Sequence, residues 1–318
     1  MIGIPKIIVL SRKGFDREAG GCASPIFSDG RMASIPIPEN TKHPDVTITF
    51  RSLPVPKDGH DDIVCILKSL RPQFDLDRRV HLDPDIRPSL RSRTFDNSLG
   101  YFGQDGKDQT ELQKWGACEP ENNVLFLFYG WFKGVTATDN GKLRYATARA
   151  DDLMTHDQHL IWGWLQSDGA PRQILSGKLA VELQRASHHP HIEARNRDNN
   201  YLFVGRERLS FANCISGWGV FQKYNPGLRL SCGMELNKRS LWRLPSFFRP
   251  MAVGRIRNAP WTTDGDCERV MYRGYGQEFI FNTEGYEAEA SSWLHRIFRY
   301  VPEERASTLY PSHPCKEL

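Results

Sequence analysis

Charged side chains suited to anion binding or proton transfer gather in one glycine-containing stretch near the start of the chain. The stretch spans residues 11–31 and contains Arg12, Lys13, Asp16, Asp29 and Arg31. Glycines let backbone amides approach a ligand closely, and arginine holds a phosphate or carboxylate with two hydrogen bonds. We therefore predict a phosphate- or base-binding loop. The alternative is an ordinary surface turn, because the spacing matches neither common glycine-rich phosphate motif.

A possible metal site begins at the pair His81 and Asp83. A short strand running into Pro84 would place both side chains on one side, because alternate strand residues share a face. Such a pair resembles one arm of a site with two histidines and one carboxylate. The third ligand of a divalent metal would be His189 or His191, from the densest histidine cluster in the chain. The alternative for His81 and Asp83 is a hydrogen-bonded structural pair. The alternative for the histidine cluster is an exposed polar loop.

Hydrophobic patterning predicts the elements that must position these residues. Short runs rich in β-branched and aromatic residues predict strands at 7–10, 32–37, 46–50, 78–83, 124–132, 143–147, 159–166, 201–205 and 276–281. Amphipathic or capped segments predict helices at 61–70, 109–116 and 288–300. Strands dominate without regular βα alternation, so the fold class is α+β, with a strongly bent mixed or barrel-like β-sheet and a few flanking helices. We expect one domain over residues 1–300 and a C-terminal tail over residues 301–318.

Composition limits the classes of protein to which the chain could belong. It has 318 residues, 39% of them hydrophobic, and a formal net charge of +4, which permits a polyanionic partner without requiring one. Seven cysteines occur without a C-x-x-C pair, as expected for free thiols in a reducing compartment. No signal peptide or apolar run of about 18 residues is present. We therefore expect a soluble, cytoplasmic protein with no membrane partner.

Several polar and aromatic residues could contact a nucleobase. Gln104 could read a base edge or an amide, or it could cap the helix that follows it. Trp131, Trp162 and Trp164 could stack on a flipped base. Aromatic residues interleaved with arginines between 239 and 249 could stack bases and neutralise phosphates, although core packing is the stronger interpretation for Trp242.

Eight short motifs together resemble the nucleotide modification associated domain 3 family. They are Ser-Arg-Lys-Gly-Phe-Asp at 11–16, Ser-Pro-Ile at 24–26, Asp-Gly-Arg at 29–31, Ile-Pro-Ile-Pro-Glu at 35–39, His-Leu-Asp-Pro-Asp at 81–85, Gly-Gln at 103–104, Leu-Phe-Leu-Phe-Tyr-Gly-Trp-Phe at 125–132 and Ile-Trp-Gly-Trp-Leu-Gln at 161–166. The resemblance implies a bacterial or phage system that makes or installs modified DNA bases. It points to a site lined by Arg12, Lys13, Asp16, Asp29, Arg31, His81, Asp83 and Gln104.

Three hypotheses follow for function. In the first, the chain modifies a nucleotide or DNA base. Arg12, Lys13, Arg31 and Gln104 would bind the substrate, and Asp16, Asp29, His81 or Asp83 would move a proton. A metal-assisted version adds a divalent ion held by His81, Asp83 and His191. In the second, the chain recognises modified bases without changing them, and in the third it is a scaffold for other proteins of the modification system. Nucleotide or DNA is the expected partner.

Overall fold

A mixed eight-stranded β-sheet forms the centre of the molecule. The computed structural model describes residues 3–39, 45–55, 62–91, 98–175, 181–194, 197–233, 238–271 and 278–301. The main path of the sheet runs β11 (Trp218–Val220), β8 (Gln158–Gln166), β6 (Leu125–Ala137), β1 (Ile7–Arg12), β16 (Glu278–Asn282) and β13 (Ala252–Val253). Two further strands pair with β6 off this path, namely β2 (Ser24–Ile26) and β7 (Leu143–Tyr145).

Strand β1 lies between a parallel neighbour, β6, and an antiparallel neighbour, β16. Both of its edges are therefore paired, and its four apolar residues are buried. A strand covered on both faces needs a continuous apolar run, which is the pattern that predicted strands at 7–10 and 124–132. Register pairs Arg12 with Tyr129. The strand thus continues two residues beyond its apolar run.

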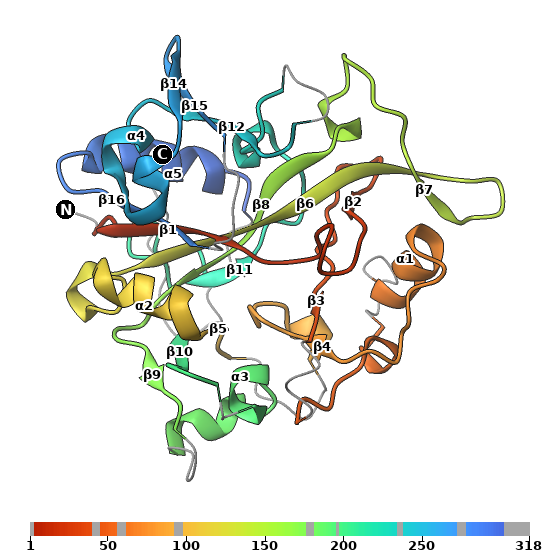
Figure 1. Ribbon diagram of the computed structural model, residues 1–318, viewed down its shortest axis with the longest axis horizontal. Helices are drawn as coiled ribbons and strands as arrows, with labels where there is room; N and C mark the ends of the chain where they lie inside the picture. The colour runs from red at the N-terminus through yellow and green to blue at the C-terminus, as the bar shows by residue number, and fades with distance from the viewer. Residues whose placement is uncertain are drawn as a thin grey trace.

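Three smaller sheets surround the central one. They are β5 (Tyr101–Gln104) with β10 (Tyr201–Val204) and β9 (Arg172–Gln173), β12 (Leu241–Pro245) with β15 (Cys267–Met271) and β14 (Trp261–Asp264), and β3 (Ile37–Pro38) with β4 (Val80–His81). Figure 1 shows β12, β14 and β15 above the central sheet and β5, β9 and β10 below it. The lower side also carries β3 and β4, so residues of the β3–β4 sheet and of the β5–β10–β9 sheet lie on the same side of the central sheet.

Five α-helices flank the sheets in the described part of the chain. They are α1 (Ile63–Leu70), α2 (Gly106–Lys114), α3 (Pro190–Glu193), α4 (Phe248–Met251) and α5 (Glu287–Phe298). Short 3-10 helices occur at Phe50–Ser52, Pro88–Leu90, Pro120–Asn122, Leu153–Thr155, Val181–Ala186, Pro226–Leu228 and Gly254–Asn258. The carboxylate of Asp62 caps α1 by accepting a hydrogen bond from the backbone amide of Cys65. Helix α5 buries Trp293 and Ile297, whereas Tyr300 lies beyond its end and is exposed.

The α+β class is confirmed, and the described strands form no closed barrel. Two predicted strands are wrong. Residues 32–37 form only isolated bridges and the start of β3, in a segment where Pro36 offers no amide donor. Residues 46–50 make one bridge through Thr49 before a 3-10 turn, because Phe50 turns into a separate apolar cluster with Phe15 and Phe74.

The remaining expectations on composition have mixed outcomes. The six described cysteines are all free thiols, as predicted, and Cys315 lies outside the described residues. Residues 302–318, which hold nearly all of the expected tail, also lie outside them. Among the described helices, none has the length and apolar character needed to cross a bilayer. Trp242 is fully buried, which confirms its interpretation as a core residue.

Candidate metal centre

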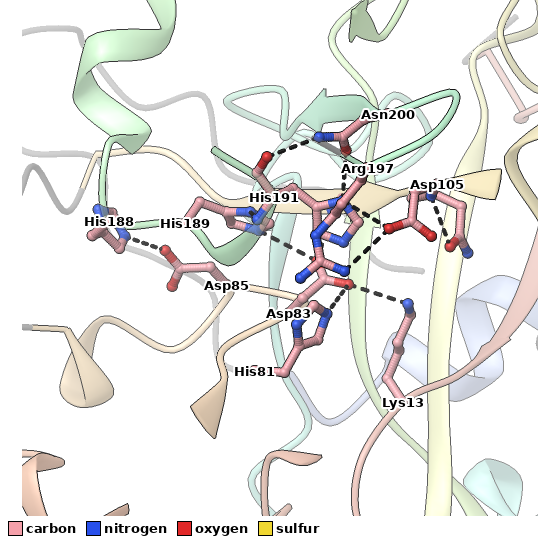
Figure 2. Close-up of polar contacts among 12 residues, drawn as sticks. Lys13, His81, Asp83, Asp85, Asp105, His188, His189, His191, Arg197 and Asn200 are labelled. Atoms are coloured by element: carbon pink, nitrogen blue, oxygen red, sulfur yellow. Dashed lines mark hydrogen bonds and ion pairs between the residues drawn. The ribbon is translucent and has the colours of Figure 1, made fainter. Parts of the chain in front are cut away.

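Three side chains that could bind one metal ion converge on the lower side of the sheet. His81, Asp83 and His191 each offer one ligand atom, and these atoms lie within 4.8 Å of one another. All three residues are buried. Figure 2 shows them coming from β4, from the segment after β4 and from α3. Ligands about 2.1 Å from one ion lie within about 4.2 Å of each other, so these side chains would have to move slightly closer together to hold one.

The ring of His81 is oriented by Glu39. Its Nδ1 lies 2.7 Å from Oε2 of Glu39, and because a carboxylate accepts, Nδ1 carries the hydrogen. The other nitrogen, Nε2, is 3.7 Å from Oδ2 of Asp83. Burial would lower the pKa of His81, but the hydrogen bonds to Asp83 and Glu39 raise it above its ordinary value. A carboxylate behind the histidine is the usual support for a metal-binding imidazole.

The ring of His191 is oriented in the same way by Asn200. Its Nδ1 lies 2.7 Å from Oδ1 of Asn200, while Nδ2 of Asn200 donates to the backbone carbonyl of His191. The amide oxygen accepts, so Nδ1 of His191 holds the hydrogen and Nε2 keeps its lone pair. The ring rests on Gly103, where an added Cβ would lie 2.3 Å from it. Gly103 is thus the residue that lets α3 approach β5.

Asp83 is the centre of the polar contacts. Its Oδ2 lies 3.1 Å from Nζ of Lys13, and its Oδ1 accepts a hydrogen bond from the backbone amide of Gly103. Nε2 of His189 is 3.3 Å from the same Oδ1. Burial would raise the pKa of Asp83, but the charge of Lys13 and the contacts with His189 and His81 hold it well below its usual range. Asp83 is therefore ionised near neutral pH.

His189 is a poorer ligand than His191. Its Nδ1 accepts a hydrogen bond from the backbone amide of His191, so in the neutral ring the hydrogen sits on Nε2, facing Asp83. Burial lowers the pKa of both His189 and His191. Of the two third ligands that the sequence left open, His191 is the one with a lone pair toward the cluster.

Arg197 and two further ion pairs enclose the centre. Arg197 bridges Glu39, at 2.9 Å, and Asp105, at 3.2 Å. Behind Asp83, the carboxylate of Asp85 pairs with His188 at 2.6 Å and with Arg91 at 2.7 Å. The Asp85–His188 pair joins the segment after β4 to the segment that leads into α3, away from the rings of His81 and His191.

A second buried carboxylate, Glu278, lies next to this network. Its Oε1 accepts hydrogen bonds from Oγ of Ser11 and from Nε2 of Gln104, and its Oε2 has no hydrogen-bond partner among the described residues. Burial raises the pKa of Glu278 to about 7, although the charge of Lys13 opposes this shift. Gln104 therefore contacts the site through Glu278. Glu278 itself was not among the site residues predicted from the sequence.

The charged residues predicted near the N-terminus do not all meet at this centre. Lys13 does, but Arg12 points to the opposite face of β1, because alternate strand residues face opposite sides. Arg12 lies 3.7 Å from Asp16, whose Oδ1 also accepts from two backbone amides of a turn. Asp29 and Arg31 pair with each other at 2.6 Å in a second turn. These contacts correspond to the surface-turn alternative.

The three tryptophans considered for base stacking each make different contacts. The indole N–H groups of Trp162 and Trp164 donate to the backbone carbonyls of Lys13 and Ser216, and both rings are buried. Trp131 donates to Asp157, and the guanidinium of Arg239 lies 4.2 Å from its ring centroid. Trp162 also lines a narrow pocket together with Asp83, Gly14, Ser34 and Arg87. Of the three cluster residues, only Asp83 lines this pocket.

Partners that support the ligands were harder to find in the sequence than the ligands themselves. Glu39 is the last residue of the Ile-Pro-Ile-Pro-Glu motif, and its place in that motif was the one sequence feature that pointed to it. Asn200 and Arg197 lie in a polar stretch that resembles an ordinary loop, and their roles depend on long-range pairing of β10 with β5.

Comparison with known proteins gives one match. Residues 7–282 match nucleotide modification associated domain 3, which covers most of the chain. Neither curated proteins nor solved structures provide a significant match. The matched region contains β1, β4, α3 and β16, and therefore every side chain of the candidate centre. The chain belongs to the nucleotide modification associated domain 3 family.

Proposed function

We propose that this chain is a metal-dependent enzyme that acts on a nucleotide or DNA base within a modification system. His81, Asp83 and His191 would bind one divalent transition-metal ion, and the remaining coordination positions would take water or substrate. One observation carries the proposal. Both histidines have Nδ1 occupied by an oxygen acceptor, so Nε2 is the nitrogen that each would offer to a metal ion, His81 after losing its second proton.

The charges around the centre also favour a cation. Three acids, Glu39, Asp83 and Asp105, surround it. Two cations, Lys13 and Arg197, oppose them, which leaves one negative charge in excess with neutral histidines. An unbalanced buried charge is costly. In the absence of metal, a proton on His81 supplies the balance, in agreement with the raised pKa of that residue.

Lys13 would act as a fixed positive charge rather than as a base. Burial would lower its pKa, but the charges of Asp83 and Glu278 raise it, so Lys13 stays protonated near neutral pH. Its ammonium group would hold the carboxylate of Asp83 in place and attract an anionic substrate oxygen.

A metal ion held in such a centre would supply electrophilic catalysis. An ion with three protein ligands and open positions polarises a carbonyl or phosphoryl oxygen, or it lowers the pKa of a bound water. Glu278, with a pKa of about 7, would exchange a proton near neutral pH on the Lys13 side of the site. The family description associates the domain with nucleotide modification, which supports a nucleotide or base as the substrate.

Elemental analysis of anaerobically purified protein tests the proposal. We expect stoichiometric iron, manganese, cobalt or zinc in the wild type and its loss in His81→Gln and His191→Gln. His188→Gln is the matched control, because His188 is also buried but pairs with Asp85 instead of facing the cluster. Circular dichroism would confirm that each variant is folded. Metal retained by both cluster variants, or a wild type that binds none when reconstituted, would contradict the proposal and favour a reader or a scaffold.

A further inference from the structure

A second cavity lies on the opposite face of the central sheet from the metal centre. Its volume is about 700 Å³, and it is bounded by β12, α5 and the 3-10 helix Pro226–Leu228. Trp242 of β12 packs on Tyr129 and Phe279. Those two residues pair in register with Arg12 and Leu10, on the face away from Lys13. Two of the elements that bound it, β12 and α5, lie in the upper half of the molecule in Figure 1.

Three arginines line this cavity: Arg229, Arg243 and Arg296. The only acid in the described lining is Asp264, whose Oδ2 accepts from Nε of Arg243 at 3.2 Å and from Nε of Arg269 at 2.9 Å. The ion pair uses only the Nε donor of Arg243. The charge of the lining is therefore positive in sum, and its one carboxylate is already shared by two guanidinium groups.

Arg229 carries the strongest sign of an anion site. Its Nε and Nη1 atoms are buried and have no hydrogen-bond partner among the described residues. Burial lowers the pKa of Arg229, and the neighbouring hydroxyl group of Tyr224 opposes this shift. Arg229 is half-buried, and buried N–H groups without an acceptor cost free energy, part of which an anion bound in the cavity would recover. Its Nη1 lies beside Gly233, which also lines the cavity. A Cβ added at Gly233 would lie 3.2 Å from this nitrogen.

The walls between the arginines are apolar. Leu230, Leu244 and Trp293 line the cavity with side chains that belong to the main core. A cavity of this size suits a small organic molecule, since ligand pockets span roughly 300–1,000 Å³. Positive charge together with an apolar wall fits a ligand with an anionic group and an apolar body better than it fits a bare inorganic ion.

We propose that this cavity binds an organic phosphate of about the size of a nucleoside monophosphate. Arg229, Arg243 and Arg296 contact the phosphate, and the body of the ligand rests on Leu230, Leu244 and Trp293. Guanidinium groups are the preferred partners of phosphate oxygens in proteins. Because the cavity and the metal centre lie on opposite faces of the sheet, occupancy of one does not require the other.

Isothermal titration calorimetry at low ionic strength tests this inference with thymidine 5′-monophosphate, thymidine and inorganic phosphate as probes. We expect one binding site for the monophosphate, weaker binding of inorganic phosphate and the weakest binding of thymidine. Arg243→Gln and Arg296→Gln should each weaken the monophosphate by about 10-fold or more, the size of a lost charge-assisted hydrogen bond. Both arginines are exposed at the rim, so these variants should fold.

Two controls separate this site from the rest of the molecule. Arg249→Gln removes a half-exposed arginine that pairs with Glu268 outside the cavity, and it should leave binding unchanged. His81→Gln should also leave it unchanged, which distinguishes a failure here from a failure of the metal proposal. The inference is overturned if neither phosphate probe binds at millimolar concentration, if the arginine variants bind like the wild type, or if inorganic phosphate binds as tightly as the monophosphate.

Discussion

Glu39 holds the imidazole of His81 through a contact of 2.7 Å, so that Nδ1 is occupied and Nε2 faces Asp83. Asn200 does the same for His191 from a different part of the chain. Two independent supports that leave the same ring nitrogen of two neighbouring histidines unoccupied by an acceptor are the arrangement expected of a metal centre. The first four predictions below follow from these contacts and from their buried surroundings.

Glu39→Ala should weaken metal binding without removing it. Loss of the carboxylate leaves Nδ1 of His81 without its acceptor, so the ring is no longer fixed, and such losses typically lower affinity roughly 10- to 100-fold. Competition with a chromophoric chelator measures the change. Glu121→Ala, at an exposed position, is the control and should behave like the wild type. Equal affinities in the two variants would show that Glu39 does not support a ligand.

Gly103→Ala should displace His191. The new Cβ would lie 2.3 Å from the imidazole ring, so α3 must move away from β5. We expect loss of about 1–3 kcal/mol in the free energy of unfolding from overpacking, together with weaker metal binding. Urea denaturation and chelator competition measure the two effects. Gly3→Ala, where the nearest atom is 4.0 Å away, is the control. Full metal affinity in Gly103→Ala would separate His191 from the site.

Lys13→Met should destabilise the metal-free protein and be rescued by metal. Removal of the ammonium group leaves the buried charge of Asp83 without its main partner, which typically costs about 3–5 kcal/mol. A divalent ion bound to Asp83 would restore the balance of charge. Urea denaturation with and without Zn²⁺ measures both steps, with exposed Lys142→Met as the control. A variant as stable as the wild type without metal, or one that Zn²⁺ does not stabilise, would contradict this prediction.

Glu278 should make the stability of the protein fall as pH rises. Its pKa is raised by burial from 4.5 to about 7 in the folded state, so the folded protein holds the proton that the unfolded chain releases. Stability from this group is complete below pH 4.5 and is lost progressively up to about pH 7, by at most about 3 kcal/mol. Urea denaturation across this range should show a smaller pH slope in Glu278→Gln than in the wild type. Identical slopes would mean that Glu278 titrates normally.

The sequence allowed part of this centre to be predicted, for definite physical reasons. His81 and Asp83 are two residues apart, so strand alternation alone predicts that they share a side. His191 was detectable because histidines are clustered around it. The opposite orientations of Arg12 and Lys13 were not predicted, because the apolar run ends at Leu10 while β1 continues to Arg12.

Other parts of the centre depend on contacts between distant segments. Glu278 is adjacent to Ser11 only because β16 pairs with β1 in antiparallel register. Asn200 faces His191 because β10 pairs with β5 beside α3. Local sequence carries no information about such pairings. Predictions from periodicity therefore located strands such as β6 and helices such as α5, but not the residues that orient the ligands.

Titration with Co²⁺, followed by visible absorption under anaerobic conditions, tests the metal centre most directly, because the ligand-field bands of bound Co²⁺ report the atoms that coordinate it. We predict a spectrum that saturates at one ion per chain in the wild type and in His188→Gln. The bands should be lost or strongly altered in His81→Gln, Asp83→Asn and His191→Gln. A wild-type spectrum indistinguishable from that of Co²⁺ in buffer, or one unchanged in all three variants, would contradict the account.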